Sequence, residues 1–260
     1  MIQPLLKADS LANELTDALK RGDSITEIEL RRYLNDIAKY SSGIQLAYLK
    51  ALAYSLANKK DKAIEYFEIA LQTPNTVYAG NYLAYIHYRG RFSERRELSQ
   101  RLARQYESPS MCFMAYQVNI FHGDVSAAEE FYKKYIKLSQ EKESDFLSKE
   151  FQDAKSKLQE FLDGSGLSEE QVAILASSII EVIDANEVRV RGIEILSTKG
   201  HEEKVNAYSM SVLTDDAELL ANMNFELSYK LAEHDELSDK KFSAWIRGGK
   251  NEGKEIESCL

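Results

Sequence analysis

Apolar residues recur at helical spacing along two neighbouring stretches between residues 47 and 75. In the first stretch, Ala51 and Tyr54 fall on one side of a helix. In the second, the apolar positions follow the i, i+3/i+4, i+7 pattern of a helix with one buried face, at Ala63, Ile64, Phe67, Ala70 and Leu71. Asn58-Lys59-Lys60 separates the stretches, and Pro74 ends the second because proline lacks a backbone donor. The pattern predicts two helices joined by a short turn.

Similar turns recur along the first two thirds of the chain. Aligning Gly22, Asn58, Gly90 and Gly123 spaces the turns 36, 32 and 33 residues apart. Gly and Asn tolerate positive φ where a helix ends, and apolar residues at helical spacing surround each turn. We therefore predict an α-solenoid of antiparallel helix pairs over residues 1–162, in which each pair buries its face against its neighbours. The amphipathic stretch 144–162 predicts a further helix that caps the stack.

The pair at 47–75 resembles a tetratricopeptide repeat, and the resemblance covers about residues 10–162. The matching positions are Ala51, Tyr54, Ala63, Phe67, Ala70 and Pro74. Ala47 stands where the family has an aromatic residue, and Pro74 arrives one residue early. The resemblance implies that the first helix of each pair lines a concave groove. Projected onto this sequence, that groove carries Tyr48, Tyr78, Asn81, Tyr85, Tyr88, Arg89, Phe113 and Gln117.

These groove residues have two interpretations. Exposed tyrosines beside an arginine are what protein interfaces use, because they offer rigid apolar area with polar tips. Buried tyrosines would only fill the space between helices. The Lys and Asn pattern with which family members clamp a free carboxylate is not evident, so we do not expect capture of a partner's free C-terminus.

Residues 21–24, Arg-Gly-Asp-Ser, match an adhesion signal that cell-surface receptors recognise. They also occupy the first of the predicted turns, and His-Gly-Asp-Val at 122–125 stands at the same place in a later pair. Receptor recognition needs an extracellular protein with an extended loop, and the sequence indicates neither. The turn is therefore the favoured interpretation.

A different pattern begins after residues 163–168, whose two glycines and two serines predict a linker. Ser168 and Gln171 have the spacing of a capping box, which predicts a helix to about Val182. Alternating apolar and polar residues predict strands at 187–196, 204–213 and 241–247, with a β-bulge where the alternation shifts at Gly192. A second helix is predicted between the last two strands, with a buried stripe of Leu219, Leu220, Met223, Leu227 and Leu231.

The order α-β-β-α-β predicts a small α+β domain at residues 168–248. The expected fold class is therefore an α-solenoid of antiparallel helix pairs followed by a small α+β domain. The polar residues 249–260 are expected to form a flexible tail.

The net negative charge of the protein arises entirely from the last third of the sequence. Residues 165–260 hold 10 Lys+Arg and 19 Asp+Glu, a balance of -9, which equals the net charge of the whole protein. Such a surface repels nucleic acid and attracts a basic partner. Candidate residues for this acidic face are Glu202, Glu203, Asp215, Asp216, Asp235 and Glu236. The face either keeps the protein soluble or covers a basic protein.

The sequence offers little that indicates catalysis. We find no phosphate-binding glycine loop and no histidine spacing typical of a metal site, so neither a cofactor nor a metal is expected. Cys112 and His122 could be drawn as a thiol–imidazole pair, but a cysteine on a solenoid helix usually only packs. No apolar run is long enough to cross a membrane, no signal peptide is recognised, and two cysteines form no disulfide framework, which together favour the cytoplasm.

Three functions remain open. The first is a non-enzymatic protein–protein adaptor whose partner is a protein or peptide, a basic one among the options, which it would regulate or neutralise as an antitoxin or immunity protein does. The second is an enzyme with its site in the α+β domain, formed by Arg189, Arg191, His201 and the acidic residues, with the solenoid recruiting substrate. The third is a scaffold that self-assembles into homo-oligomers. Neither direct nucleic-acid binding nor membrane binding is expected.

Overall fold

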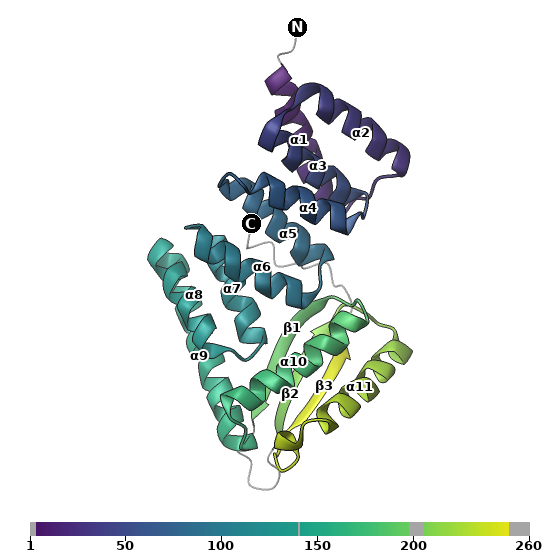
Figure 1. Cartoon of the computed structure of the whole chain (residues 1–260). Coiled ribbons are helices and arrows are strands. Elements are labelled where there is room, and N and C mark those ends of the chain that lie inside the picture. Colours follow the sequence, from purple (N-terminus) through teal and green to yellow (C-terminus); the bar gives the residue numbers. More distant parts are fainter. Residues whose placement is uncertain (1–3, 140, 198–204, 250–260) are drawn as a thin grey trace. The chain divides into compact units, whose positions relative to one another are not determined.

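The computed structural model describes residues 4–139, 141–197 and 205–249 (Figure 1). Its contacts divide the protein into two compact units, Met1–Arg89 and Gly90–Leu260. The predicted loop between the first two strands lies outside the described residues from 198 to 204, and so does the predicted tail from residue 250 onward.

The first unit consists of helices that pack in neighbouring pairs, as in a helical repeat. Helices α3 and α4 form the closest pair, and α1 packs against α2 and α3 (Figure 1). Leu49, Leu52 and Phe67 are completely buried between these helices. The helices are α1 (Pro4–Lys20), α2 (Glu27–Tyr40), α3 (Gly43–Leu56), α4 (Lys60–Ala70) and α5 (Thr76–Arg89).

Positive φ marks three of the four predicted turns. Gly22, Asn58 and Gly123 have φ of 76°, 54° and 69°, as expected for residues that end a helix. Gly90 is not among the residues of positive φ in the described ranges, and Arg91 after it has extended backbone that leads directly into the next helix. Three of the four predicted turns therefore share a residue with positive φ.

The Arg-Gly-Asp-Ser segment forms the turn between α1 and α2. Arg21 pairs with Asp23 at 2.8 Å, so the two charged side chains of the motif bind each other. The carbonyl of Gly22 accepts a hydrogen bond from the Arg89 guanidinium at 3.2 Å. Thr26 then caps α2 in a reciprocal capping box with Glu29. These contacts show that the segment serves as a turn between two helices.

The second unit combines further helices with a three-stranded sheet. Strand β2 is central, antiparallel to β1 and parallel to β3. The predicted bulge is confirmed by a register shift between Val190 and Gly192. The helices are α6 (Phe92–Gln105), α7 (Pro109–Phe121), α8 (Val125–Leu138), α9 (Glu141–Ser165), α10 (Glu169–Ala185) and α11 (Ala217–Ala232), with a short 3-10 turn η1 (Asp235–Leu237). The strands are β1 (Val190–Ser197), β2 (Asn206–Val212) and β3 (Ser243–Gly248).

The core of this unit lies between the sheet and the helices α10 and α11, which cover one face (Figure 1). Tyr208 of β2 is 0% exposed, and its ring packs 5.9 Å from that of Phe161 on α9. Its hydroxyl donates a hydrogen bond of 2.8 Å to the carbonyl of Phe121, the last residue of α7. Tyr208 thus ties the sheet to two of the preceding helices.

The order of elements confirms the predicted fold class, helix pairs followed by an α-β-β-α-β arrangement. The packing groups them differently from the predicted domains at 1–162 and 168–248, because contacts divide the protein after Arg89. Residues 163–165 of the expected linker continue α9, and the carbonyl of Ser165 accepts from the backbone of Lys241 just before β3. Helices α6–α9 therefore belong to the same compact unit as the sheet.

Candidate partner-binding surfaces

Tyr48 connects the three helices α1, α3 and α5 of the first unit. Its ring stacks on that of Tyr78 at 3.9 Å between centroids, with 13° between the ring planes. Asn81 donates a hydrogen bond of 2.6 Å from its amide to the Tyr48 hydroxyl, which also bonds with Thr16 of α1. Burial raises the pKa of Tyr48, so its hydroxyl stays protonated at neutral pH. The stack fixes the position of Tyr78.

The predicted groove residues separate into core and surface positions. Tyr48 and Tyr85 are only 3% and 4% exposed and belong to the core. Tyr78 and Asn81 are half-buried, so part of each remains accessible. Tyr88 and Arg89 are exposed at the end of α5, where Arg89 holds the first turn through the Gly22 carbonyl.

The remaining predicted groove residues lie in the other unit. Phe113 and Gln117 are half-buried on α7, and the Phe113 ring contacts those of Tyr116 and Tyr135 at 6.0 and 5.8 Å. Within the first unit, Gln45 donates to the exposed carboxylate of Asp9 at 3.3 Å. Burial, followed by the charge of Asp9, raises the pKa of Tyr78. We name Asp9, Gln45, Tyr78 and Asn81 the aromatic face.

Four of the predicted acidic residues lie at the two ends of α11. Asp215 and Asp216 precede the helix, and Asp216 caps it by accepting from the backbone of Glu218 and Leu219 at 3.0 Å. Asp235 and Glu236 form the turn η1 after its other end. Since the helix has 16 residues, about 24 Å separates these pairs. Glu202 and Glu203 lie outside the described residues.

Between these acidic ends, α11 carries an exposed aromatic pair that was not predicted from the sequence. Phe225 is 67% exposed and Tyr229 is 75% exposed. The predicted stripe on the opposite side is confirmed at its centre, since Met223 and Leu227 are 0% and 1% exposed. The spacing of Phe225 and Tyr229 by four residues, out of phase with that stripe, was the available signal.

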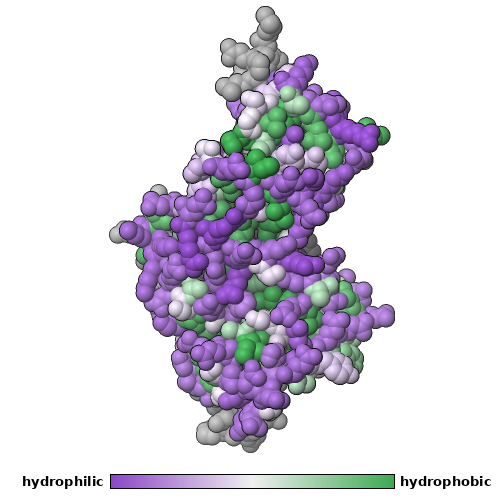
Figure 2. All heavy atoms as spheres, in the orientation of Figure 1, coloured by the Kyte–Doolittle hydropathy of each residue, from purple (hydrophilic) through white to green (hydrophobic). Residues whose placement is uncertain are grey.

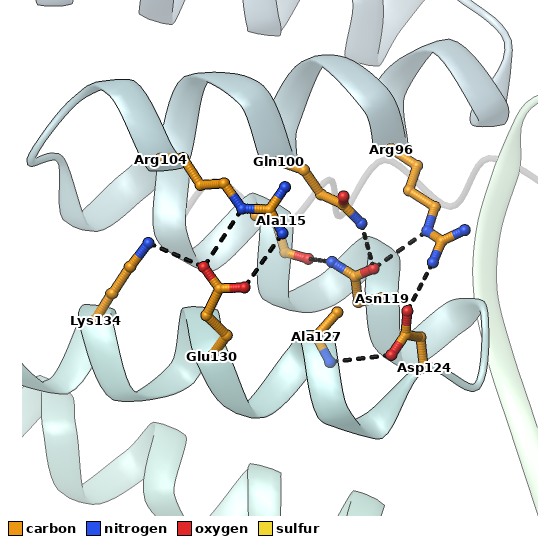
Figure 3. Close-up of polar contacts among 9 residues, drawn as sticks. All are labelled: Arg96, Gln100, Arg104, Ala115, Asn119, Asp124, Ala127, Glu130 and Lys134. Carbon is orange, nitrogen blue, oxygen red and sulfur yellow. Dashed lines mark hydrogen bonds and ion pairs between the residues drawn. The ribbon is translucent and has the colours of Figure 1, made fainter.

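A polar network centred on the buried Asn119 joins α6 to α7 and α8 (Figure 3). Asn119 is 0% exposed, and its side-chain oxygen accepts from Arg96 at 3.1 Å and from Gln100 at 2.6 Å, while its amide nitrogen donates to the Ala115 carbonyl. Arg96 also pairs with Asp124 at 2.9 Å. Asn119 thus finds partners for both ends of its side chain, which is what a buried amide needs to stabilise a helix interface.

The same interface continues toward the ends of α6 and α8. Glu130 pairs with Arg104 at 3.2 Å and with Lys134 at 3.0 Å (Figure 3). The Arg104 hydrogen bond is the main cause that lowers the pKa of Glu130. Because these charges are matched within the network, we assign it to holding the helices together.

The chemistry around His122 does not form a catalytic arrangement. Cys112 and His122 lie near opposite ends of α7, roughly 15 Å apart along the helix, and burial raises the pKa of the Cys112 thiol. His122 instead approaches Ser177, with 3.4 Å between its Nε2 and the Ser177 hydroxyl. Its Nδ1 is buried without a hydrogen-bond partner in the described structure, so the third group that orients the base of a Ser–His–Asp triad is missing.

The other sites considered from the sequence are also limited. His201 of the hypothetical enzyme site lies outside the described residues. Among the residues that the structure describes, no group of three or more His, Cys, Asp or Glu side chains could hold a metal ion. None of the described helices has both the length and the apolar content needed to cross a bilayer.

Comparison of the sequence and the fold with protein-family models, with curated proteins and with solved structures finds no match.

Proposed function

We propose that this protein is a non-enzymatic adaptor whose helix pairs are of the tetratricopeptide type and whose first unit holds a segment of a partner protein on the aromatic face. The observation that supports this most is the Tyr48–Tyr78 stack at 3.9 Å, locked by the Asn81 hydrogen bond. A ring that is already fixed loses little side-chain entropy when a partner covers it. Tyrosine held in this way is a common anchor of protein interfaces.

The partner we propose is basic, and its activity is regulated or neutralised by binding. The acidic excess of residues 165–260 supports this, because an excess of nine negative charges accelerates encounter with a positively charged protein. On the aromatic face, the exposed carboxylate of Asp9, which accepts from Gln45, offers a contact for a Lys or Arg of the partner. An antitoxin or immunity protein is one form of this function.

The test compares capture of proteins from the native cells by the full-length protein and by two variants. Tyr78→Ala removes the half-buried ring, whereas Val77→Ala removes a neighbouring side chain that is 65% exposed. We expect a partner that is captured by the wild type and by the Val77 variant, and lost with the Tyr78 variant. Thermal unfolding of each variant verifies that it is folded. Failure of the wild type to retain any protein, or equal capture by both variants, would count against the proposal.

A further inference from the structure

Helix α11 presents an apolar strip to the surface. Phe225 and Tyr229 lie one turn apart on the same side, and Ala221 and Ala232 extend that side in both directions; all four are exposed. In the view of Figure 2, hydrophobic spheres gather among hydrophilic ones over the region of α10 and α11. Two large rings at 67% and 75% exposure on one face exceed what a scattered surface residue explains.

The helix cannot rotate to bury this strip. On its inner side Met223 and Leu227 are fixed in the core. Asn224 accepts from the backbone N–H of Ile246 at 2.9 Å and donates to the Ile246 carbonyl at 2.8 Å. This double hydrogen bond ties α11 to strand β3, so the strip is held outward by the fold.

The fully exposed charged residues of α11 and its C-cap are all acidic. Glu218, Glu226 and Glu233 are exposed near the strip, and Glu226 also accepts from the Asn186 amide at 2.9 Å. Lys230, the one cation in the helix sequence, pairs with Glu181 of α10 at 2.6 Å. The acidic pairs Asp215–Asp216 and Asp235–Glu236 add charge at the two ends. An apolar strip with an acidic border is complementary to an apolar strip with a basic border.

A second copy of the protein fits this surface poorly. In a parallel pair, each glutamate on the exposed side would face its own counterpart. In an antiparallel pair that brings the two aromatic pairs together, Glu218 of each copy would approach Glu233, Asp235 and Glu236 of the other. Both arrangements place like charges together, which disfavours self-association.

We propose that the exposed face of α11 docks a basic amphipathic helix of a partner protein, with apolar residues at i, i+3/i+4 and i+7 over Phe225 and Tyr229 and with Lys or Arg toward Glu218, Glu226 and Glu233. This inference rests on the basic partner of the proposed function and specifies where and how it binds. The aromatic face of the first unit takes no part in it.

The test measures binding of a fluorescein-labelled 18-residue helix of leucine and lysine, in a heptad pattern, to the full-length protein by fluorescence anisotropy. We expect the double variant Phe225→Ala/Tyr229→Ala to weaken binding at least tenfold. The triple variant Glu218→Gln/Glu226→Gln/Glu233→Gln should weaken it and reduce its dependence on salt. Ile28→Ala, which removes a side chain 81% exposed on α2, should leave binding unchanged. A leucine–glutamate helix of the same pattern should not bind.

Equal binding of the leucine–lysine helix to the wild type and the double variant overturns the α11 site but leaves a basic partner possible elsewhere on the protein. Absence of any binding to the wild type overturns the docking of a basic amphipathic helix on α11, whereas the capture experiment decides separately whether the proposed function holds. If sedimentation shows a wild-type dimer that the double variant abolishes, a second copy is the occupant and the inference is wrong. Loss of partner capture by Tyr78→Ala bears on the aromatic face alone.

Discussion

Two glycines with positive φ differ in what a methyl group would meet. At Gly22, φ is 76° and nothing lies within 4 Å of an added Cβ. At Gly123, φ is 69° and an added Cβ would lie 2.7 Å from Cγ1 of the buried Val172. An alanine at position 22 would therefore cost only backbone strain. An alanine at position 123 would cost backbone strain and a clash within the core.

We expect Gly22→Ala to lower the free energy of unfolding by about 1 kcal/mol and Gly123→Ala by about 2–4 kcal/mol. Urea unfolding followed by circular dichroism measures both. Arg21→Ala is the control, because an exposed ion pair such as Arg21–Asp23 contributes less than about 1 kcal/mol. Equal costs at the two glycines would contradict the contact with Val172.

His122 makes the stability of the second unit depend on pH. Burial, with the nearby charge of Arg96, lowers the pKa of His122 to about 4 from its ordinary value of 6.5. Between these two values the unfolded protein binds a proton that the folded protein does not. The contribution of the neutral His122 ring to the free energy of unfolding is therefore fully present above pH 6.5 and is lost as the pH decreases toward 4.

We expect His122→Gln to reduce the loss of stability between pH 7.5 and pH 4.5 by about 1–2 kcal/mol, less than the full linkage because the ring is only partly buried. Urea unfolding at a series of pH values provides the measurement, and His234→Gln, at a half-buried position after α11, serves as the control. A wild-type pH profile that the His122 variant leaves unchanged would show that the ring accepts a proton in the folded state.

At the scale of single elements, the start of α6 is capped by a residue from α10. Asp184 is 9% exposed and accepts from the backbone N–H groups of Phe92 and Ser93 at 2.7 and 3.1 Å and from the Ser93 hydroxyl at 2.7 Å. A helix normally finds such an acceptor at its own N-cap residue. Here the carboxylate comes from 92 residues later in the sequence.

We expect Asp184→Ala to lower the free energy of unfolding by about 2–4 kcal/mol, because it leaves the buried N–H of Phe92 and the part-buried donors of Ser93 without their acceptor. Asp184→Asn keeps one acceptor and should cost less. Asp216→Ala removes an exposed local cap of α11 and should cost only about 1 kcal/mol. Urea unfolding gives the free energies, and amide exchange at Phe92 and Ser93 should accelerate in the Asp184 variants. A cost for Asp184→Ala no larger than that of Asp216→Ala would contradict this role.

The elements were predictable from the sequence where their signals are local. The capping box of Ser168 and Gln171 and the bulge at Gly192 depend on residues within a few positions of each other, and both are confirmed. The cap from Asp184 and the Tyr208–Phe121 hydrogen bond join distant segments, so periodicity carries no signal for them.

The same distinction applies to the candidate surfaces. Tyr48 and Tyr85 occupy groove positions by spacing, yet both are core residues because neighbouring rings cover them. Phe225 and Tyr229 lie out of phase with the buried stripe in the sequence, but their exposure was settled only by which side of α11 meets the sheet. Helical spacing shows which residues lie on the same side of a helix, whereas tertiary packing decides which side is buried.

At the scale of the whole molecule, one core extends across the predicted linker. Phe92 of α6, Val118 of α7 and Phe161 of α9 belong to the same buried cluster as Val172 of α10 and Tyr208 of β2. Composition around residues 163–168 resembles that of a linker, but apolar burial on both sides of it is continuous. The unit that folds is therefore expected to begin near Gly90, where the contacts divide the protein.

We predict that a fragment of residues 90–260 unfolds cooperatively, whereas a fragment of residues 163–260 does not. The shorter fragment lacks α6–α9 and leaves apolar side chains of α10 and β2 facing water, and each buried large side chain is worth about 1.5–3 kcal/mol. Losing several of them exceeds the stability of a small domain. Trp245, the single tryptophan, lies on β3 and reports the folding of both fragments by fluorescence.

The expected result for residues 90–260 is one sigmoidal transition in urea, with a fixed near-ultraviolet signal that is lost with it. Residues 163–260 should show a gradual change and bind a hydrophobic dye, as proteins do when they retain helices without fixed packing. A fragment of residues 1–89 is the control, because it ends at the same boundary and keeps its own buried Leu49, Leu52 and Phe67. If residues 163–260 unfold with the same midpoint and slope as residues 90–260, helices α6–α9 add nothing to the core and the predicted division after residue 162 is the correct one.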